Sequence, residues 1–429
     1  MDLLAQPAES ITYQDVQDFC HQKVGESTVL DYKKEIPRDL AKHIAAMSNR
    51  YGGLIIVGVE EDPQTGTPSV YEGLVNDGKL VERGNQFAYN VRPLPSCLVR
   101  TTNEVNGKVF LLVRVSEGGS PPYTTVSDPT IYLRTGNVTT PLRPADAEIV
   151  RDLHAKRDLA VALQSQNVER ADGRLQAVIG LQDAEIARLA KQRRDAGIPA
   201  EAPVEFLADN LRLLTAYLQP FYPRRELAVP RIIEAKLRDL RLQRATGPFF
   251  PAMQMNPIAR GMMSVQANTK YFRFSCQQVY ANGLFHHAEN TVRPNSEAVT
   301  DICLEDIARV FYLTMLFSRR LYAEFGYQGL VRGSLGLANA RGRPVRIIPL
   351  AQRPYDSTFP GESPITIDDE YDWPIEADTH QLNDDDWLKR YFKDQMREIY
   401  WDLGYSDLRA DVLDIFIARL GVEGQTTSR

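Results

Sequence analysis

The amino-acid sequence predicts an α+β protein in which two folded domains are joined by a helical connector. Three observations lead to this fold class. Short strand-like apolar runs alternate with amphipathic helical segments through residues 1–150. Helical spacing dominates residues 151–200, and residues 201–429 again mix strand-like and helical patterns. A chain of 429 residues is too long for one ordinary domain, so we expect domain boundaries near residues 150 and 200.

The composition is that of a globular protein in water, with 43% hydrophobic and 25% charged residues. No apolar run approaches the ~20 residues that cross a bilayer, and the first ten residues lack the regions of a secretory signal. The cysteines are far apart in the sequence, which argues against a zinc site and for reduced thiols, so we expect a cytoplasmic protein. These cysteines, which we interpret as small buried hydrophobic residues, are Cys20, Cys97, Cys276 and Cys303.

Charge is unevenly distributed along the chain. The net charge is −6, whereas proteins that coat nucleic acid are more often basic. Residues 366–387 hold nine acidic residues and no Lys or Arg, while residues 151–260 are basic on balance. We therefore expect a local positive face on an acidic protein. The acidic segment is either a solvated surface loop or a strip that imitates a phosphate backbone in a nucleic-acid groove.

The N-terminal region begins with a strand, a helix and a second strand. Residues 29–33 read as a strand that presents Asp31 and Lys33, and Pro37 suits the first turn of the following helix. The Gly52-Gly53 pair ends that helix, because glycine tolerates the left-handed cap conformation. Residues 54–59 are a short apolar run typical of a buried strand, and Glu60 follows at its end.

The later elements follow from hydrophobic periodicity and turn residues. Asn106-Gly107 lies between two strand-like runs and predicts a hairpin over residues 97–115. Residues 144–196 predict two helices with a break near Asp172-Gly173, which either pack on their own domain or form a coiled-coil dimer arm. The C-terminal domain is expected to hold strands at 262–266, 271–280, 330–337 and 344–350, and helices at 206–218, 230–244, 302–325, 386–402 and 406–420.

An ordered set of motifs lies within residues 20 to 155. It comprises Glu26-Ser27, Leu30-Asp31-Tyr32-Lys33, Ala46-Met47-Ser48-Asn49, Gly52-Gly53, Gly58-Val59-Glu60 and the strand from Ile131 to Asn137. This set resembles the Schlafen AlbA-type domain. Met47 stands where the family pattern has an aromatic residue. Asp31 replaces a common Glu, and Glu60 replaces the Asp of nuclease-active members.

The resemblance implies RNA cleavage at a site of three acids, which correspond here to Glu26, Asp31 and Glu60. Three carboxylates that meet in one place repel each other unless a divalent cation such as Mg²⁺ or Mn²⁺ lies between them. Such a metal would activate water or polarise a phosphodiester, and Lys33 would neutralise charge on the phosphate. We therefore expect a metal-dependent endoribonuclease acting on structured RNA such as tRNA. The alternatives are a nucleic-acid-binding regulator that does not cleave, and a scaffold whose C-terminal domain senses a ligand or partner.

Four residues are candidates for contact with a phosphate backbone: Lys33, Lys34, Arg134 and Asn137. We expect no ATP, because the glycines at 53 and 58 are followed by Val59-Glu60 instead of the Lys-Ser/Thr that a phosphate-binding loop needs. Eukaryotic Schlafen cores resemble two such lobes around one RNA, and this chain has one lobe, so we expect a homodimer. The adjacent residues His286 and His287 should point to opposite faces of a strand, and therefore cannot share a metal ion there.

Overall fold

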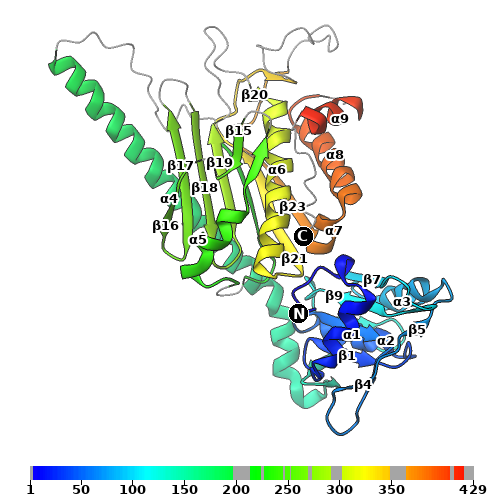
Figure 1. The fold of residues 1–429 in the computed structure, drawn as a ribbon. Coiled ribbons are helices and arrows are strands. Elements are labelled where there is room, and N and C mark those ends of the chain that lie inside the picture. The colour runs from blue at the N-terminus through cyan, green and yellow to red at the C-terminus, as the bar shows by residue number, and fades with distance from the viewer. Residues whose placement is uncertain are drawn as a thin grey trace.

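Figure 1 shows the fold in a computed structural model that describes residues 3–196, 213–223, 227–244, 247–251, 253–268, 273–290, 302–347, 364–405 and 410–419. An N-terminal and a C-terminal α+β unit share one long helix, α4 (Ala147–Asp195), that runs beside both. The predicted α+β fold class is confirmed. Within these ranges, no helix combines the length and the apolar character that crossing a membrane would need.

The N-terminal unit is built on a mixed four-stranded sheet with the order β1-β2-β9-β7. Strands β1 (Leu30–Lys33) and β2 (Gly53–Val57) are parallel, because helix α2 (Leu40–Ser48) crosses over between them. Strands β7 (Cys97–Thr101) and β9 (Leu111–Val115) form the predicted antiparallel hairpin. In its turn Asn106 and Gly107 both have positive φ, as a type I′ turn requires.

Both faces of this sheet are buried. Helices α2 and α3 (Leu80–Tyr89) pack on one face, against Ile55 and Val57. Helix α1 (Tyr13–His21) packs on the other face, against Leu54 and Ile56. The remaining elements of this unit are η1 (Ala8–Ser10), β3 (Glu60–Glu61), β4 (Pro68–Val70), β5 (Leu74–Val75), β6 (Val91–Arg92), β8 (Lys108–Val109), β10 (Thr124–Thr125), β11 (Tyr132–Thr135), β12 (Val138–Pro141) and η2 (Pro144–Asp146).

The Gly52-Gly53 pair serves close backbone packing. Both residues have positive φ. A Cβ atom on Gly52 would lie 2.4 Å from the carbonyl oxygen of Val115, and one on Gly53 would lie 2.4 Å from that of Val29. Glycine is therefore required where α2 ends and β2 enters the sheet between its two neighbours.

Helix α4 is continuous over 49 residues, so the predicted break near Asp172-Gly173 is wrong. A Cβ atom on Gly173 would meet no other atom within 4 Å. Ala171 and Leu175 on either side of it are buried against the C-terminal sheet. That packing outweighs the weak helix propensity of one glycine. The first half of α4 contacts the N-terminal unit, where the Lys156 Nζ lies 2.6 Å from a Glu117 carboxylate oxygen.

The C-terminal unit is built on an antiparallel seven-stranded sheet. Helix α6 (Leu304–Phe325) packs on one face, and the second half of α4 packs on the opposite face (Figure 1). In spatial order the strands are β16 (Met255–Ile258), β17 (Gly261–Asn268), β18 (Arg273–Tyr280), β19 (Phe285–Asn290), β13 (Leu213–Pro220), β21 (Leu330–Leu337) and β23 (Tyr371–Asp378). The other elements are α5 (Pro230–Asp239), α7 (Thr379–Asn383), α8 (Asp385–Asp402), α9 (Ala410–Arg419), β14 (Leu242–Arg244), β15 (Gly247–Phe250), β20 (Ile302–Cys303) and β22 (Val345–Arg346).

The C-terminal elements agree in part with those predicted. The predicted helix at 206–218 lies mostly outside the described residues, and its end is strand β13. The predicted strand at 344–350 is described only at β22, and residues 348–350 lie outside the described ranges. All four cysteines lie in described parts of the chain, and none of them forms a disulfide.

The acidic segment is largely part of the folded C-terminal unit, which corrects its interpretation as a solvated loop, whereas the imitation of a phosphate backbone stays a prediction. Its middle is β23, paired with β21 along its length. Asp384 accepts hydrogen bonds from backbone N–H groups at the start of α8, as a capping residue does. Asp378 accepts hydrogen bonds from Ser96 and Ser116 of the N-terminal unit, so one of these carboxylates joins the two units.

Candidate functional site

Two of the three predicted acids meet at the start of β1. Asp31 lies within the strand, and the Glu26 side chain folds back so that its Oε1 accepts a hydrogen bond of 2.7 Å from the backbone N–H of Tyr32. The carboxyl groups are close enough to share a hydrogen bond. Both side chains are buried, with 3% of Glu26 and none of Asp31 exposed.

Two basic side chains surround this pair. Arg134, on β11, places Nη2 2.8 Å from Asp31 Oδ1 and 3.4 Å from Glu26 Oε2, and also donates to the carbonyl of Ser27. Lys33 places Nζ 2.7 Å from the same Oδ1 and 3.6 Å from Glu26 Oε1. We call Glu26, Asp31, Lys33 and Arg134 the N-terminal charge cluster. Its two carboxyl groups and two basic side chains lie 2.7 to 3.6 Å from one another.

The environment separates the pKa values of the two acids. Burial, together with the hydrogen bond to Asp31, raises the pKa of Glu26 to about 8. Burial alone would also raise the pKa of Asp31. Hydrogen bonds from His43 and Glu26, with the charges of Lys33 and Arg134, instead hold it below its usual range. Asp31 is therefore the charged member of the pair near neutral pH, and Glu26 is the member that carries a proton there.

His43 also belongs to this region, although the sequence motifs do not identify it. It lies on α2, and its Nδ1 is 3.0 Å from Asp31 Oδ2. The same ring nitrogen is 3.3 Å from the hydroxyl of Thr139 on β12. The α2 crossover packs on the sheet beside β1. The sequence signal that could have identified His43 was therefore a polar residue on the inner face of that helix.

The third predicted acid, Glu60, does not join the other two. Its side chain is 41% exposed and lies 2.9 Å from the Lys34 Nζ. The chain turns after β2, because the backbone N–H groups of Gly58 and Val59 both bond to the carbonyl of Lys33. Across the described ranges, no three His, Cys, Asp or Glu side chains gather as a set that could hold a metal ion.

The donor set therefore does not fit a magnesium or manganese ion. A hard divalent cation needs several free oxygen ligands around it. Here Glu26 Oε1 accepts from a backbone N–H and Asp31 Oδ1 accepts from both Lys33 and Arg134, whereas Asp31 Oδ2 faces His43 Nδ1 at 3.0 Å. Glu60 would have to leave Lys34 to supply a third carboxylate. The predicted metal ligands Glu26, Asp31 and Glu60 are not assembled in this arrangement.

The predicted phosphate contacts differ in their accessibility. Arg134 is 1% exposed and held by carboxylates and carbonyl groups, so it is placed as a structural residue and not on the surface. Lys33 is 21% exposed within the charge cluster. Lys34 is 66% exposed, and Asn137 lies exposed at the turn between β11 and β12. Only part of the predicted contact set is therefore on the surface.

Two further basic residues lie near Lys34, on the segment that starts α2. Arg38 is exposed, and Lys42 places its Nζ 5.4 Å from the centre of the Tyr132 ring. We call Lys34, Arg38 and Lys42 the basic α2 segment. The signal for it was the run of basic residues between β1 and the start of α2, where Arg38 lies in the turn before the helix and Lys42 in its first turn.

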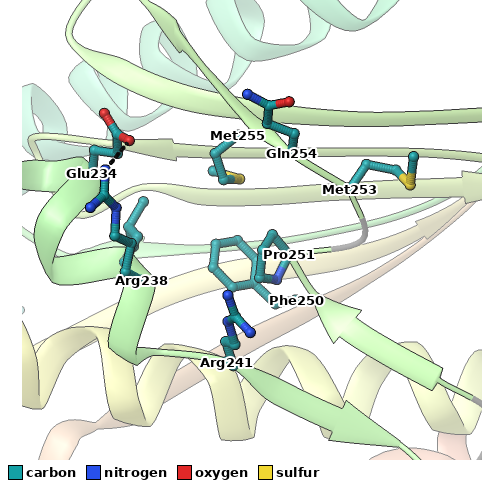
Figure 2. A pocket seen from close by; sticks show the side chains of 9 residues that line it. Glu234, Arg238, Arg241, Phe250, Pro251, Met253, Gln254 and Met255 are labelled. Atoms are coloured by element: carbon teal, nitrogen blue, oxygen red, sulfur yellow. Dashed lines mark hydrogen bonds and ion pairs between the residues drawn. The ribbon is translucent and has the colours of Figure 1, made fainter.

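The C-terminal unit contributes other candidate features. His286 Nε2 lies 2.9 Å from Asp172 Oδ1 on α4, whereas His287 Nε2 lies 3.2 Å from Glu289 Oε2. They face opposite sides of the sheet, as predicted. A cavity of about 430 Å³ lies between α5 and the start of β16, and in it Arg238 pairs with Glu234 at 2.7 Å (Figure 2).

Comparison with known proteins identifies the type of N-terminal domain. Residues 26–143 match the family model described as Schlafen, AlbA_2, which confirms the resemblance seen in the sequence. A similar solved structure is the N-terminal domain of a putative ATP-dependent DNA helicase RecG-related protein from Nitrosomonas europaea. It is 18% identical, and the match covers 31% of this chain and 93% of that one with a TM-score of 0.24, which is too low to carry an argument. No curated protein matches the chain.

Proposed function

We propose that this protein binds nucleic acid through its N-terminal domain, without cleavage at a centre of three carboxylates and a metal. The family match supports a function related to nucleic acid. The proposal that there is no cleavage at a metal centre rests on the N-terminal charge cluster. Lys33 and Arg134 pair with Glu26 and Asp31 at distances of 2.7 to 3.6 Å, and Glu60 lies apart from them beside Lys34.

The basic α2 segment is the proposed contact surface. Lys34 and Arg38 are exposed and Lys42 is half-buried, and phosphate contacts need cations that reach solvent. The salt bridge from Lys34 to Glu60 is largely exposed, so a phosphate group can replace that carboxylate at little cost. Asn137 is an additional candidate contact. Structured RNA is the substrate class that the family resemblance implies.

The charge cluster has a positioning role in this proposal. Arg134 joins β11 to β1, and Asp31 joins β1 to α2 through His43. These bonds fix the strand and the helix between which the basic α2 segment lies. A regulatory C-terminal unit and pairing of two chains along α4 remain predictions that accompany this function.

Binding of a fluorescein-labelled RNA stem-loop, measured by anisotropy as a function of salt, tests the proposal. Replacing Lys34, Arg38 and Lys42 together by Ala should weaken binding. It should also lower the slope of log affinity against log salt by ~2 to 3, because each phosphate contact contributes roughly 0.7 to 0.9. The control replaces Arg83 and Lys108, which pair with Asp77 and Glu72 elsewhere in the same domain. Equal binding by wild type and the triple variant would contradict the proposed surface.

A further inference from the structure

The cavity of Figure 2 has an apolar floor and a charged rim. It lies between α5 and the chain that leads from the end of β15 to the start of β16, and its volume is about 430 Å³. Sites for small molecules usually measure ~300 to 1,000 Å³. We call it the methionine cavity, because Met253 and Met255 line it. All of its described lining residues belong to the C-terminal unit, so it lies outside the proposed nucleic-acid surface.

The floor of the methionine cavity belongs to the main hydrophobic core of the C-terminal unit. Leu237 of α5 and Phe250 of β15 are buried members of that core, and Met255 packs against it. The centre of the Phe250 ring lies 3.9 Å from that of Phe317 on α6, which fixes the ring in place. An apolar ligand would therefore cover side chains that the fold already holds, and little ordering of the floor would oppose binding.

Met253 forms one wall, and its backbone is held while its side chain is exposed. The hydroxyl of Ser264 on β17 bonds to both the N–H and the carbonyl of Met253, at 2.9 and 3.0 Å. Met253 itself is 53% exposed. A thioether side chain is flexible and polarisable, so it adapts to apolar groups of different shapes. Burial of this exposed apolar surface favours a ligand that has an apolar part.

The rim of the methionine cavity carries a net positive charge. Its charged residues within the described ranges are two arginines and one glutamate, which sum to +1: Glu234, Arg238 and Arg241. Arg238 Nη2 lies 2.7 Å from Glu234 Oε1, so these two charges offset each other. Arg241 is exposed just beyond the end of α5, and Figure 2 shows its side chain beside Phe250. The positive charge of the rim therefore lies next to the apolar floor.

A ligand with one negative charge and an apolar body matches this arrangement. One anion balances the net charge of the rim, and a planar carboxylate matches the fork of donors that a guanidinium presents. Gln254, which also lines the rim, has an amide that can donate a further hydrogen bond. A polyphosphate would bring more negative charge than the rim offsets. The apolar floor next to Arg241 then receives an alkyl chain.

We propose that the methionine cavity binds a free monocarboxylate with an apolar chain, in the class of short and medium-chain fatty acids. Arg241 pairs with the carboxylate, and the alkyl chain lies against Leu237, Phe250 and Met255. The site adds a small-molecule ligand to the protein, and it does not rest on the proposed binding of nucleic acid.

Titration calorimetry of the full chain with butanoate, hexanoate and octanoate tests the apolar floor. Affinity should rise about tenfold for each two methylenes added, because each buried methylene contributes a similar free energy. Octan-1-ol has the same chain without a charge and should bind about tenfold more weakly than octanoate. No binding of octanoate at millimolar concentration would overturn the proposal, as would equal affinity along the series or for octan-1-ol.

Two substitutions on the rim should shift octanoate affinity in opposite directions. Arg241→Met should weaken octanoate about tenfold and leave octan-1-ol unchanged. Glu234→Gln should strengthen octanoate, because it removes the carboxylate that competes for Arg238. Both residues are exposed, so the thermal midpoint of the ligand-free protein should stay the same. The control, Arg397→Met on α8, should leave both affinities unchanged. An unchanged ratio of octanoate to octan-1-ol affinity in both rim variants would overturn the assigned pairing.

A matched pair of methionine substitutions separates the floor from the fold. Met255 and Met263 lie on neighbouring strands but on opposite faces of the sheet, because Met263 pairs with Asn256 and packs in the core beneath α4. Met255→Gln should weaken octanoate and octan-1-ol alike, by about tenfold. Met263→Gln should change neither affinity. Equal losses in the two variants would show that the effect comes through the sheet, and would overturn the assigned floor.

Discussion

The N-terminal charge cluster and the basic α2 segment both concentrate basic side chains, but they leave these side chains in opposite states. In the cluster, Arg134 and Lys33 are committed to Glu26 and Asp31, and Arg134 is 1% exposed. In the basic α2 segment, Lys34 is 66% exposed, and its ion pair with Glu60 lies at the surface. The availability of a cation for phosphate is therefore decided by its pairing and burial, and a count of basic residues in the sequence cannot show it.

The difference also predicts where substitutions are costly. A buried charge that loses its partner destabilises the fold, because the remaining ion is neither solvated nor compensated. An exposed cation is solvated whether or not a ligand is bound, so its removal affects binding more than folding.

The largest expected effect is therefore the replacement of Arg134. Arg134→Met should lower the free energy of unfolding by about 3 to 5 kcal/mol, because Asp31 would be left buried beside Lys33 alone. Urea unfolding followed by circular dichroism measures this loss. Arg238→Met on α5, whose ion pair with Glu234 is largely exposed, is the matched control and should change stability by less than ~0.5 kcal/mol. Similar losses in the two variants would break the comparison.

A second variant separates charge from packing. Adding Asp31→Asn to Arg134→Met should recover part of the lost stability, since it removes the buried carboxylate that has lost one of its two cations. The two substitutions contact each other, so a coupling of roughly 0.5 to 3 kcal/mol is expected. Strictly additive effects would mean that the Arg134 side chain stabilises the domain through packing and its carbonyl contacts only.

The next effect is a dependence of stability on pH. The raised pKa of Glu26 in the folded state, about 8, means that the folded protein holds this proton more tightly than the unfolded chain. Its contribution is therefore complete at about pH 4 and is lost as the pH rises towards 8. Asp31, whose pKa is lowered, stabilises the fold fully above about pH 4, and this stability is lost as the pH falls further into acid.

Glu26→Gln tests this assignment because the amide keeps the shape and does not titrate. Thermal midpoints measured between pH 5 and pH 9 should fall less with pH in the variant than in the wild type, and the variant should be the more stable protein above about pH 8. Parallel curves for the two proteins would show that Glu26 is already ionised in the folded state near neutral pH.

The smallest stability effect is expected at Lys34. Its ion pair with Glu60 is exposed, and such pairs contribute ~0 to 1 kcal/mol to the free energy of unfolding. Lys34→Ala should leave the thermal midpoint within a degree or two of the wild type and still weaken binding of the RNA stem-loop, most clearly at low salt. A large loss of stability would place Lys34 in the charge cluster instead of on the binding surface.

Local parts of the fold were predictable from the sequence, because each depends on residues close together in the chain. The strand–helix–strand unit around Asp31, the Asn106-Gly107 hairpin and the opposite directions of His286 and His287 are of this kind. The continuity of α4 was not predictable, since it depends on burial of Ala171 and Leu175 against a distant sheet.

The candidate site was predictable in part. The convergence of Glu26 and Asp31 follows from their places beside one strand. The position of Glu60 depends on how the chain turns after Gly58. The burial of Arg134 depends on its contacts with Glu26 and β1, about a hundred residues earlier in the chain. A sequence motif names the residue types at a site, but it does not say which carboxylates are already compensated by cations.

The central claim is that Lys33 and Arg134 compensate Glu26 and Asp31 in place of a metal ion. RNA cleavage in the presence and absence of manganese tests this claim most directly. An end-labelled RNA stem-loop would be incubated with the wild type and with Asp31→Asn, in EDTA and in millimolar MnCl₂, and resolved on a denaturing gel. Intact RNA in all four samples, with the same wild-type binding affinity in EDTA and in MnCl₂, is the predicted result. Cleavage that requires manganese and disappears in a folded Asp31→Asn protein would contradict it.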